Sequence, residues 1–371
     1  MSSGVHAFDV SIHPLQQRLG SKQSGVAAGC YSCHILHPET VSIPSWLSLN
    51  YSCTGSPQVW EARPSPGKGI GVFATRALEP GDIILAEPAI IKIEPPDFRD
   101  GAAYPLNSIE SLLYSAFDTL SEEKQAEVMS LHAHLTPDEE NQDKDSHMLV
   151  PIFRSNAYIV GKTLSELGLF PKGARINHSC RPNSSQVWID KIGKRVVRAV
   201  RPIAEGEEIF ATYIPLLRDQ KSRQQRLDQY GFKCTCSACT QDRAAQADSD
   251  KRRSSIRKAF ADFEPQLTLS VPQSINGRKK AEKNAAASVD LAKLVEEEGL
   301  ADYYAQAYRV VALSHARIEK WDTATLWAHK SYELNLVADE DSPATLEMMA
   351  LTQRFIQSWN ADLYNKSKQE G

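Results

Sequence analysis

The spacing of the cysteines is the feature that most constrains this chain. There are seven: Cys30, Cys33, Cys53, Cys180, Cys234, Cys236 and Cys239. An odd number excludes a framework in which every cysteine is disulfide-bonded, and the chain is far longer than the small secreted domains that need one. The last three form a Cys-x-Cys-x-x-Cys knot, whose spacing is too tight for good disulfide geometry throughout and suits a single metal ion. The cysteines therefore predict a metal site in a reducing compartment.

A structural zinc ion needs four ligands, and the knot supplies three. Outside residues 1–57 the one remaining cysteine is Cys180, in the sequence Asn-His-Ser-Cys. We therefore expect about one zinc ion per chain, held by Cys180, Cys234, Cys236 and Cys239, with His178 as a weaker candidate for the fourth ligand. Three reduced, buried thiols are the alternative, and the polar residues around the knot argue against it.

The N-terminal cysteines give a weaker signal. Cys30 to His34 reads Cys-Tyr-Ser-Cys-His, which formally matches haem attachment and redox patterns, but no strand precedes it. A second zinc site is a further alternative, with ligands drawn from Cys30, Cys33, Cys53, His34 and His37. Because residues 1–57 are rich in Ser, Gly and His and have no periodicity, we expect an unligated flexible arm.

Composition excludes several classes of function. The chain is 42% hydrophobic and 24% charged, which is typical of a globular protein with two or three domains. Its net charge of -4 lacks the basic excess of most nucleic-acid-binding surfaces, so we expect no direct nucleic-acid partner. The most apolar stretch is interrupted by Glu87, Pro88 and Lys92, and it is too short to span a membrane. We therefore expect a soluble protein.

Two β segments flank a helical one. From Gly67 onward, short apolar runs alternate with turns, and Pro80-Gly81 fits a type II turn. Helical spacing follows at about 105–136. Strand character then returns, and Arg201–Ala211 echoes Arg76–Ala86 in its acidic Gly turn and apolar strand. One β fold interrupted by a helical insert accounts for this order.

The C-terminal third has helical periodicity. The segment from Gln241 to Phe260 is polar and charged, which indicates a helical linker or a solvated face. Further on, Tyr303–Pro343 has the apolar spacing of a helix-turn-helix pair like those of tetratricopeptide repeats, with Trp321-Asp322 expected at the turn. One pair does not make a repeat array.

Four motifs occur in a characteristic order: the Gly-Lys-Gly-Ile-Gly turn at Gly67–Gly71, Arg-Ile-Asn-His-Ser-Cys-Arg-Pro-Asn at Arg175–Asn183, Gly-Glu-Glu-Ile-Phe-Ala-Thr-Tyr at Gly206–Tyr213, and the cysteine knot. In isolation the first fits an ordinary β-turn as well as a turn whose backbone approaches a ligand closely. Together they resemble the SET-domain methyltransferases with a cysteine-rich post-SET segment. The resemblance covers residues 60–240, and the helical C-terminus resembles that of the SET-and-MYND group and of related fungal SET proteins.

One departure from that group concerns the zinc-binding MYND finger that interrupts its SET domain early. This chain has no cysteine between Cys53 and Cys180. It is similar to a relative without the finger, so partner recognition through a MYND finger is not expected.

The resemblance implies an α+β fold: a mostly-β SET domain (a β-clip with a pseudoknot) with a helical insert, a zinc-bound post-SET segment and an all-α, tetratricopeptide-like C-terminal region. The implied boundaries are an arm at 1–57, a SET domain at 58–214, a post-SET segment at 215–240 and helices at 241–371.

The resemblance also implies roles for individual residues around S-adenosyl-L-methionine. Tyr213 corresponds to the catalytic tyrosine and Tyr230 to the second tyrosine of the lysine channel, whose wall includes Tyr158. The cofactor would meet both backbone and side chains at Asn177 and His178. The implied cofactor contacts are Lys68, Gly69, Asn156, Asn177, His178, Tyr213 and Phe232.

These roles are chemically reasonable. A lysine side chain, whose ordinary pKa is about 10.4, must lose its proton before it attacks a sulfonium methyl, and an aromatic channel disfavours the ammonium form. The enzyme then mainly orients the amine for an in-line displacement.

The leading hypothesis is therefore an S-adenosylmethionine-dependent protein-lysine methyltransferase of the nucleus or cytoplasm, acting on a histone (a chromatin role) or another protein. The alternative is a non-catalytic SET scaffold whose C-terminal helices bind a partner protein. Nothing in the residues favours a small-molecule substrate.

Overall fold

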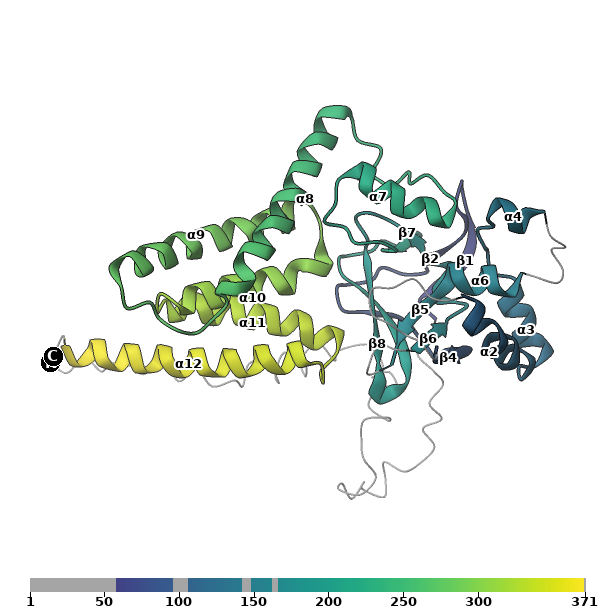
Figure 1. The fold of residues 1–371 in the computed structure, drawn as a ribbon. Coiled ribbons are helices and arrows are strands. Elements are labelled where there is room, and N and C mark those ends of the chain that lie inside the picture. The colour runs from purple at the N-terminus through teal and green to yellow at the C-terminus, as the bar shows by residue number, and fades with distance from the viewer. Residues whose placement is uncertain (1–57, 96–105, 142–147, 162–165, 370–371) are drawn as a thin grey trace, which may run out of the picture. The chain divides into compact units, whose positions relative to one another are not determined.

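A computed structural model describes residues 58–95, 106–141, 148–161 and 166–369 (Figure 1). The expected N-terminal arm lies outside these residues, and so do Cys30, Cys33 and Cys53. The described part is built from small sheets followed by long helices, an α+β fold as predicted.

Three small sheets make up the β part of the described chain. The first has the order β1 (Trp60–Ser65), β2 (Gly69–Ala74), β10 (Glu208–Ala211), β7 (Asn177–His178). The second has the order β3 (Ile83–Glu87), β9 (Lys194–Ala199), β8 (Ser184–Ile189). The third has the order β4 (Ile91–Ile93), β6 (Glu166–Leu169), β5 (Ala157–Val160).

Glycine determines the turns of these sheets. The β1–β2 hairpin closes through a Lys68 N–H bond to Ser65 O, with Gly67 and Gly69 at φ of 73° and 74°. Gly81 has φ of 96° in the turn closed by Asp82 N–H and Glu79 O, as a type II turn requires.

The repeated segments adopt matching turns. Gly206 (φ 78°) occupies a turn closed by Glu207 N–H and Ala204 O. The two turns meet at an antiparallel bridge between Leu78 and Ile203. The echo in the sequence therefore corresponds to two paired β corners.

One parallel pairing creates the site described below. β7 pairs with β10, so that Asn177 lies opposite Phe210 and His178 opposite Ala211. This pairing joins segments about 30 residues apart in the sequence. Tyr213 follows shortly after the end of β10 and so lies close to β7. The strand β7 has two residues, too few to show a pattern in the sequence.

Among the described residues between β4 and β5 there are four helices: α2 (Leu106–Asp118), α3 (Glu122–Met129), α4 (Pro137–Glu140) and α6 (Leu149–Asn156). The first two occupy the range expected for a helical insert. Helix α6 was not predicted from the sequence. It has Pro151 in its first turn, where proline costs no helical hydrogen bond.

The helix α7 (Gln220–Leu227) precedes the cysteine knot and was also not predicted. Its first turn is capped by the Asp219 carboxylate, which accepts a bond from Ser222 N–H.

The C-terminal region is helical as predicted, with α8 (Arg243–Phe263), α9 (Ile275–Glu297), α10 (Tyr304–Ala316), α11 (Trp321–Ala338) and α12 (Pro343–Gln369). The last four pack side by side in chain order (Figure 1). None of the helices in the described ranges is both long and apolar enough to cross a membrane.

Two details of the helical region differ from expectation. Trp321 and Asp322 begin α11, and the turn lies before them, at Glu319 with φ of 57°. In addition, α8 is more than a solvated linker, because Ser249 and Arg253 are fully buried in it. The reason is a buried ion network that sequence polarity alone cannot reveal.

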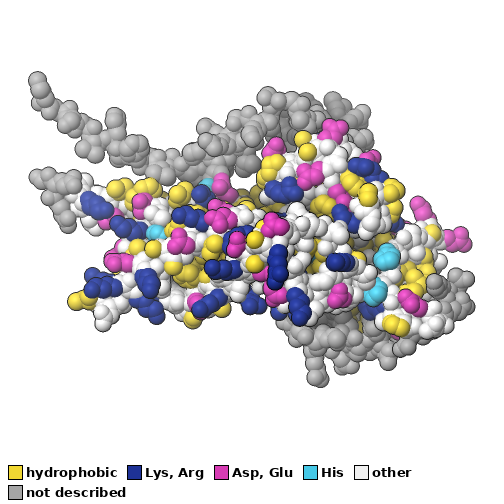
Figure 2. Space-filling model, turned by 90° about the horizontal axis from the view of Figure 1, so that it is seen from above, with side chains coloured by type: hydrophobic (Ala, Val, Ile, Leu, Met, Phe, Trp, Pro, Cys, Tyr) yellow, Lys and Arg dark blue, Asp and Glu magenta, His cyan; other side chains and the backbone are white. Residues whose placement is uncertain are grey.

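The helical surface carries charges of both signs. In the view of Figure 2, basic and acidic side chains are interspersed over this face, and no continuous basic patch forms on it.

Candidate active site and metal centre

The four predicted cysteines converge. The sulfurs of Cys180, Cys234, Cys236 and Cys239 all lie within 4.8 Å of one another, and Cys180 and Cys234 are buried. Cys180 follows β7, whereas the other three follow α7, so this cluster joins two distant segments.

The donor set fits a zinc ion. Tetrahedral Zn–S bonds of about 2.3 Å hold sulfurs about 3.8 Å apart, and Cys180 Sγ lies 3.7 Å from Cys239 Sγ. Hydrogen bonds from Cys180 and the other cysteines hold the pKa of Cys236 far below its ordinary value, and a bond from Cys180 contributes most to a pKa of about 7 for Cys239. Bonds with Cys234, Cys236 and Cys239 raise the pKa of Cys180 in turn, and for Cys234 the lowering by Cys180 is outweighed by Cys236 and Cys239, so that its pKa is raised overall. Two of the four sulfurs thus favour the thiolate form that binds metal, and the other two keep their protons until a cation replaces them.

The backbone around the cluster is tightly held. Cys180 N–H donates to Cys236 Sγ (3.4 Å), and Cys239 N–H donates to Cys236 O (2.8 Å). The Ser179 hydroxyl accepts a bond from Arg181 N–H (3.1 Å), which is the turn role that its position suggests.

A buried ion network attaches this cluster to the C-terminal helices. The fully buried Glu298 carboxylate accepts bonds from Arg181, Ser249, Arg252 and Arg253. Arg253 also donates to Cys180 O (2.9 Å) and Leu216 O (2.8 Å). A charge placed where water cannot reach is stable only with such partners.

Aromatic rings gather beside the cluster, at the end of β10. The Tyr213 ring lies 5.2 Å from Tyr230, 5.4 Å from His178 and 6.4 Å from Phe232, measured between centroids. Its hydroxyl donates to Ile176 O (2.7 Å). Burial, followed by the nearby Tyr158 and Tyr230, raises the pKa of Tyr213, which therefore stays a neutral phenol at pH 7.

Tyr158 approaches this group from β5. Its ring packs edge-on against Phe170 (6.2 Å), and the Arg195 guanidinium carbon lies 3.1 Å from its centroid. Burial and then Tyr158 raise the pKa of Tyr230. The structure thus brings the three predicted tyrosines into one region.

The turn before β2 is joined to β7 through Glu208, the first residue of β10. The Glu208 carboxylate accepts hydrogen bonds from Ser65 Oγ (2.9 Å), Lys68 Nζ (3.0 Å) and Asn177 Nδ2 (2.8 Å). A Cβ on Gly71 would collide with the same carboxylate. Two of the predicted cofactor residues, Lys68 and Asn177, therefore share an anchor that the sequence analysis did not identify.

Asn156, the last residue of α6, donates through Nδ2 to His132 O (2.7 Å) and Ile152 O (2.8 Å). These bonds use the amide group to close the helix end. Gly69 is the first residue of β2. The ring centroid of Phe232 lies 6.3 Å from that of His178.

The contacts of His178 differ from those expected. Its Nδ1 accepts a bond from Tyr213 N–H (3.1 Å), and its Nε2 lies 3.3 Å from Cys180 Sγ. Both nitrogens are thus engaged within the protein, so what His178 can offer a cofactor is its backbone. The fourth sulfur of the cluster comes from Cys180, so His178 is not needed as a ligand.

Arg195 is a second residue that sequence reasoning missed. It is 4% exposed, and strand alternation places it on the same face of β9 as the buried Val197 and Ala199. That alternation was the one signal in the sequence that could have identified it.

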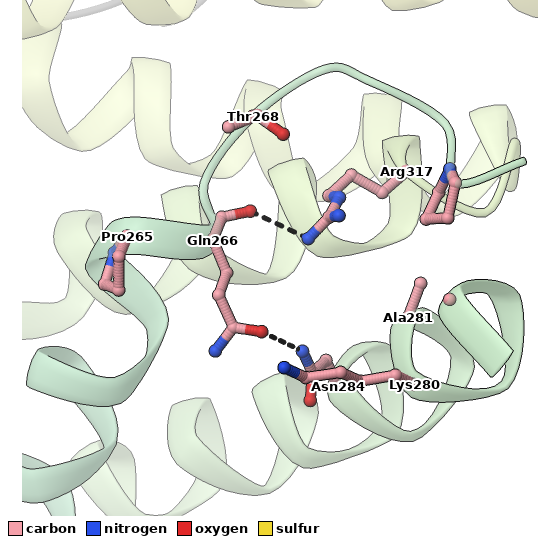
Figure 3. Close-up of a pocket in the computed structure, with 9 residues that line it drawn as sticks. Pro265, Gln266, Thr268, Lys280, Ala281, Asn284 and Arg317 are labelled. Carbon is pink, nitrogen blue, oxygen red and sulfur yellow. Dashed lines mark hydrogen bonds between the residues drawn. The ribbon is translucent and has the colours of Figure 1, made fainter. Parts of the chain in front are cut away.

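A pocket of about 220 Å³ lies elsewhere, between the loop after α8 and helix α9 (Figure 3). Arg317 Nη1 donates to Gln266 O (3.0 Å), and Asn284 Nδ2 donates to Gln266 Oε1 (2.6 Å). Gln266 is thus paired with both Arg317 and Asn284, and none of the predicted site residues lines the pocket.

Comparison with known proteins gives a family for the β part. Residues 69–214 match the family model of the SET domain. The histone-lysine N-methyltransferase set5 of Schizosaccharomyces pombe is 32% identical over 202 residues, which cover 54% of this chain and 56% of set5. The N-lysine methyltransferases SMYD2 of Sus scrofa and Homo sapiens are 37% identical over 155 residues, which cover 39% of this chain and 34% of SMYD2. The chain thus spans about half of the first relative and a third of the others.

Proposed function

This chain contains a SET domain at residues 69–214, and from that premise we propose that it is an S-adenosyl-L-methionine-dependent protein-lysine N-methyltransferase. The observation that carries the proposal is the convergence of Tyr158, Tyr213 and Tyr230. The named activities of set5 and SMYD2 are of the same class.

The cofactor residues follow from the SET resemblance. The backbone of Lys68 and Gly69 would hold the methionine end, and Asn177 and Asn156 would lie beside it. The backbone of His178 and the ring of Phe232 would meet the adenine end. When bound, S-adenosylmethionine supplies the methyl group that a lysine amine attacks.

The tyrosines act on the lysine. A channel walled by aromatic rings disfavours the ammonium form, so that the amine enters with its lone pair available. The same rings attract the methylated product by cation–π contact.

Tyr213 also acts through its oxygen. Its hydroxyl proton is donated to Ile176 O, which leaves the lone pairs of the phenol free. Such an oxygen stabilises a methyl group that becomes partly positive during transfer.

The proposal also includes one zinc ion. Cys180, Cys234, Cys236 and Cys239 would hold one ion, whose role is to fix the segment that carries Tyr230 and Phe232. We propose a histone or another protein as target, a nuclear or cytoplasmic location, and partner proteins at the C-terminal helices. Leu346, Met349 and Leu363 on α12 are 37–49% exposed, which supports a protein-binding surface there.

Transfer from labelled S-adenosylmethionine to histones and to lysate proteins tests the proposal. We expect transfer by the wild-type protein and a loss of about 100-fold or more in kcat for Tyr213→Phe, since this residue touches the reacting methyl. Tyr364→Phe, on the exposed end of α12, is the matched control. Full activity of Tyr213→Phe would overturn the catalytic assignment. An inert wild-type protein whose melting temperature does not respond to the cofactor would favour the scaffold alternative.

A further inference from the structure

We propose that the imidazole of His178 is a positioning group that links the metal centre to Tyr213, donating from Nε2–H to Cys180 Sγ and accepting at Nδ1 from Tyr213 N–H. The inference rests on the proposed function, because it takes the cysteine cluster as the metal site and Tyr213 as a catalytic residue. It assigns the side chain of His178 a task distinct from cofactor binding.

The hydrogen bonds determine the tautomer. A backbone N–H can only donate, so the 3.1 Å bond from Tyr213 requires an unprotonated Nδ1. A neutral imidazole then carries its proton on Nε2, which lies 3.3 Å from Cys180 Sγ. The direction of this second contact is thereby fixed as N–H to sulfur.

The surroundings hold the ring in this orientation. His178 is 4% exposed and lies in β7, directly opposite Ala211 on β10. The rings of Tyr213 and Phe232 pack at 5.4 and 6.3 Å from it. The ring therefore cannot turn to another partner without breaking the aromatic group.

The link explains how a metal outside the aromatic channel can act on it. A thiolate bound to a cation is a charged acceptor, and hydrogen bonds to charged groups are stronger than neutral ones. Groups that bond to metal ligands commonly set both ligand orientation and metal retention. Through His178, an ion at Cys180 would therefore orient the backbone of Tyr213.

Two substitutions separate the two bonds. In His178→Asn, the amide reaches the position of Nδ1, so an acceptor for Tyr213 N–H is kept and the donor to Cys180 is lost. In His178→Gln, the longer amide reaches the position of Nε2, so the donor is kept and the acceptor is lost. His329→Gln, on α11, is the control, since its ring pairs with Glu333 far along the chain from both groups.

Each variant is prepared as the full chain with zinc, and two quantities are measured: the rate of zinc transfer to a chromogenic chelator, and kcat and KM for labelled methyl transfer. We expect His178→Asn to release zinc about tenfold faster and to lower kcat by about threefold, because an ion at Cys180 no longer orients Tyr213 through the side chain at 178. We expect His178→Gln to release zinc at the wild-type rate with kcat about tenfold lower and an unchanged KM. The control should match wild type in both.

Equal effects of both variants on both quantities, or no effect of either, would overturn the link. A wild-type protein without methyl transfer would defeat the proposed function alone, since the zinc-release comparison still tests the bond to Cys180. If a variant does not fold, the tautomer is read in the wild-type protein from two-bond nitrogen–proton NMR correlations of the histidine rings. A proton on Nδ1 of His178 contradicts the inference.

Discussion

Glu208 shows how one side chain can organise residues that are distant in sequence. Its carboxylate accepts bonds from Ser65, Lys68 and Asn177, and its side chain is 10% exposed. The sequence indicated Lys68 and Asn177 from their motifs, but their common anchor depends on β2, β7 and β10 meeting in one sheet. Local spacing contains no information about such a meeting, and the sequence therefore predicted these two residues without the group that orients them.

The role of Glu208 leads to a test at the level of cofactor affinity. Glu208→Gln keeps the shape of the side chain but removes the charge that pairs with Lys68. Since hydrogen bonds to charged groups contribute about 1.5–3 kcal/mol, we expect the Kd for S-adenosylmethionine to rise about tenfold or more. Titration calorimetry measures it, with the exposed Glu205→Gln as control. An unchanged Kd would show that Lys68 and Asn177 do not depend on Glu208.

At the scale of elements, a feature could be predicted when its signal lay in the local spacing of the sequence. The cysteine knot, the glycine turns and the long C-terminal helices were predicted because each depends on local spacing. Cys180 was found by elimination, which succeeded because no other cysteine follows residue 57 outside the knot. The short strands β6 and β7 have too few residues for a period to appear.

The buried face of helix α8 was not predicted, for a different reason. Its buried face contains Ser249 and Arg253, which read as solvated residues. They are buried because Glu298, just after α9, supplies an opposite charge from 45 residues away along the chain. Polarity marks exposure only where no such partner exists.

Glu298 therefore connects α8 to the end of α9. Its contribution to the free energy of unfolding depends on pH. Burial raises its pKa, but the hydrogen bond from Ser249 and the charges of Arg253 and Arg181 outweigh this, so that the pKa is lowered overall from 4.5. A lowered pKa stabilises the folded state above the unfolded-state value, and this contribution is lost as pH falls through the folded-state value.

We expect Glu298→Gln to lower the free energy of unfolding at pH 7 by about 3–5 kcal/mol, because it leaves several arginines around a neutral side chain. The difference from wild type should begin to narrow as pH falls below about 4.5, where the carboxylate of the unfolded chain gains its proton, and should keep narrowing until pH has fallen through the lower pKa of the folded state. Urea unfolding at several pH values measures this, with the exposed neighbour Glu297→Gln as control. A difference that stays constant with pH would contradict the ionic role.

At the scale of the whole molecule, the cysteine cluster and the helical region share one core. Cys180 and Cys234 belong to the same buried cluster as Ile256 and Phe260 of α8 and Val311 of α10. Arg253 adds a direct bond from α8 to Cys180 O. Residues Val59–Gly371 accordingly form one compact unit, in which the segment with Cys234, Cys236 and Cys239 connects the β part to the helices.

This shared core predicts that zinc removal destabilises helices that contain no metal ligand. We expect about one zinc ion per chain by elemental analysis. A strong chelator should lower the melting temperature of the far-ultraviolet helical signal, most of which comes from the long helices α8 to α12, because four sulfurs without a metal ion would remain in and beside their core. Added zinc should restore it, whereas magnesium, which prefers oxygen ligands, should not. If the helical transition keeps its midpoint while zinc leaves, the C-terminal region is an independent module, and the Cys180–Arg253 joint does not couple it to the SET domain.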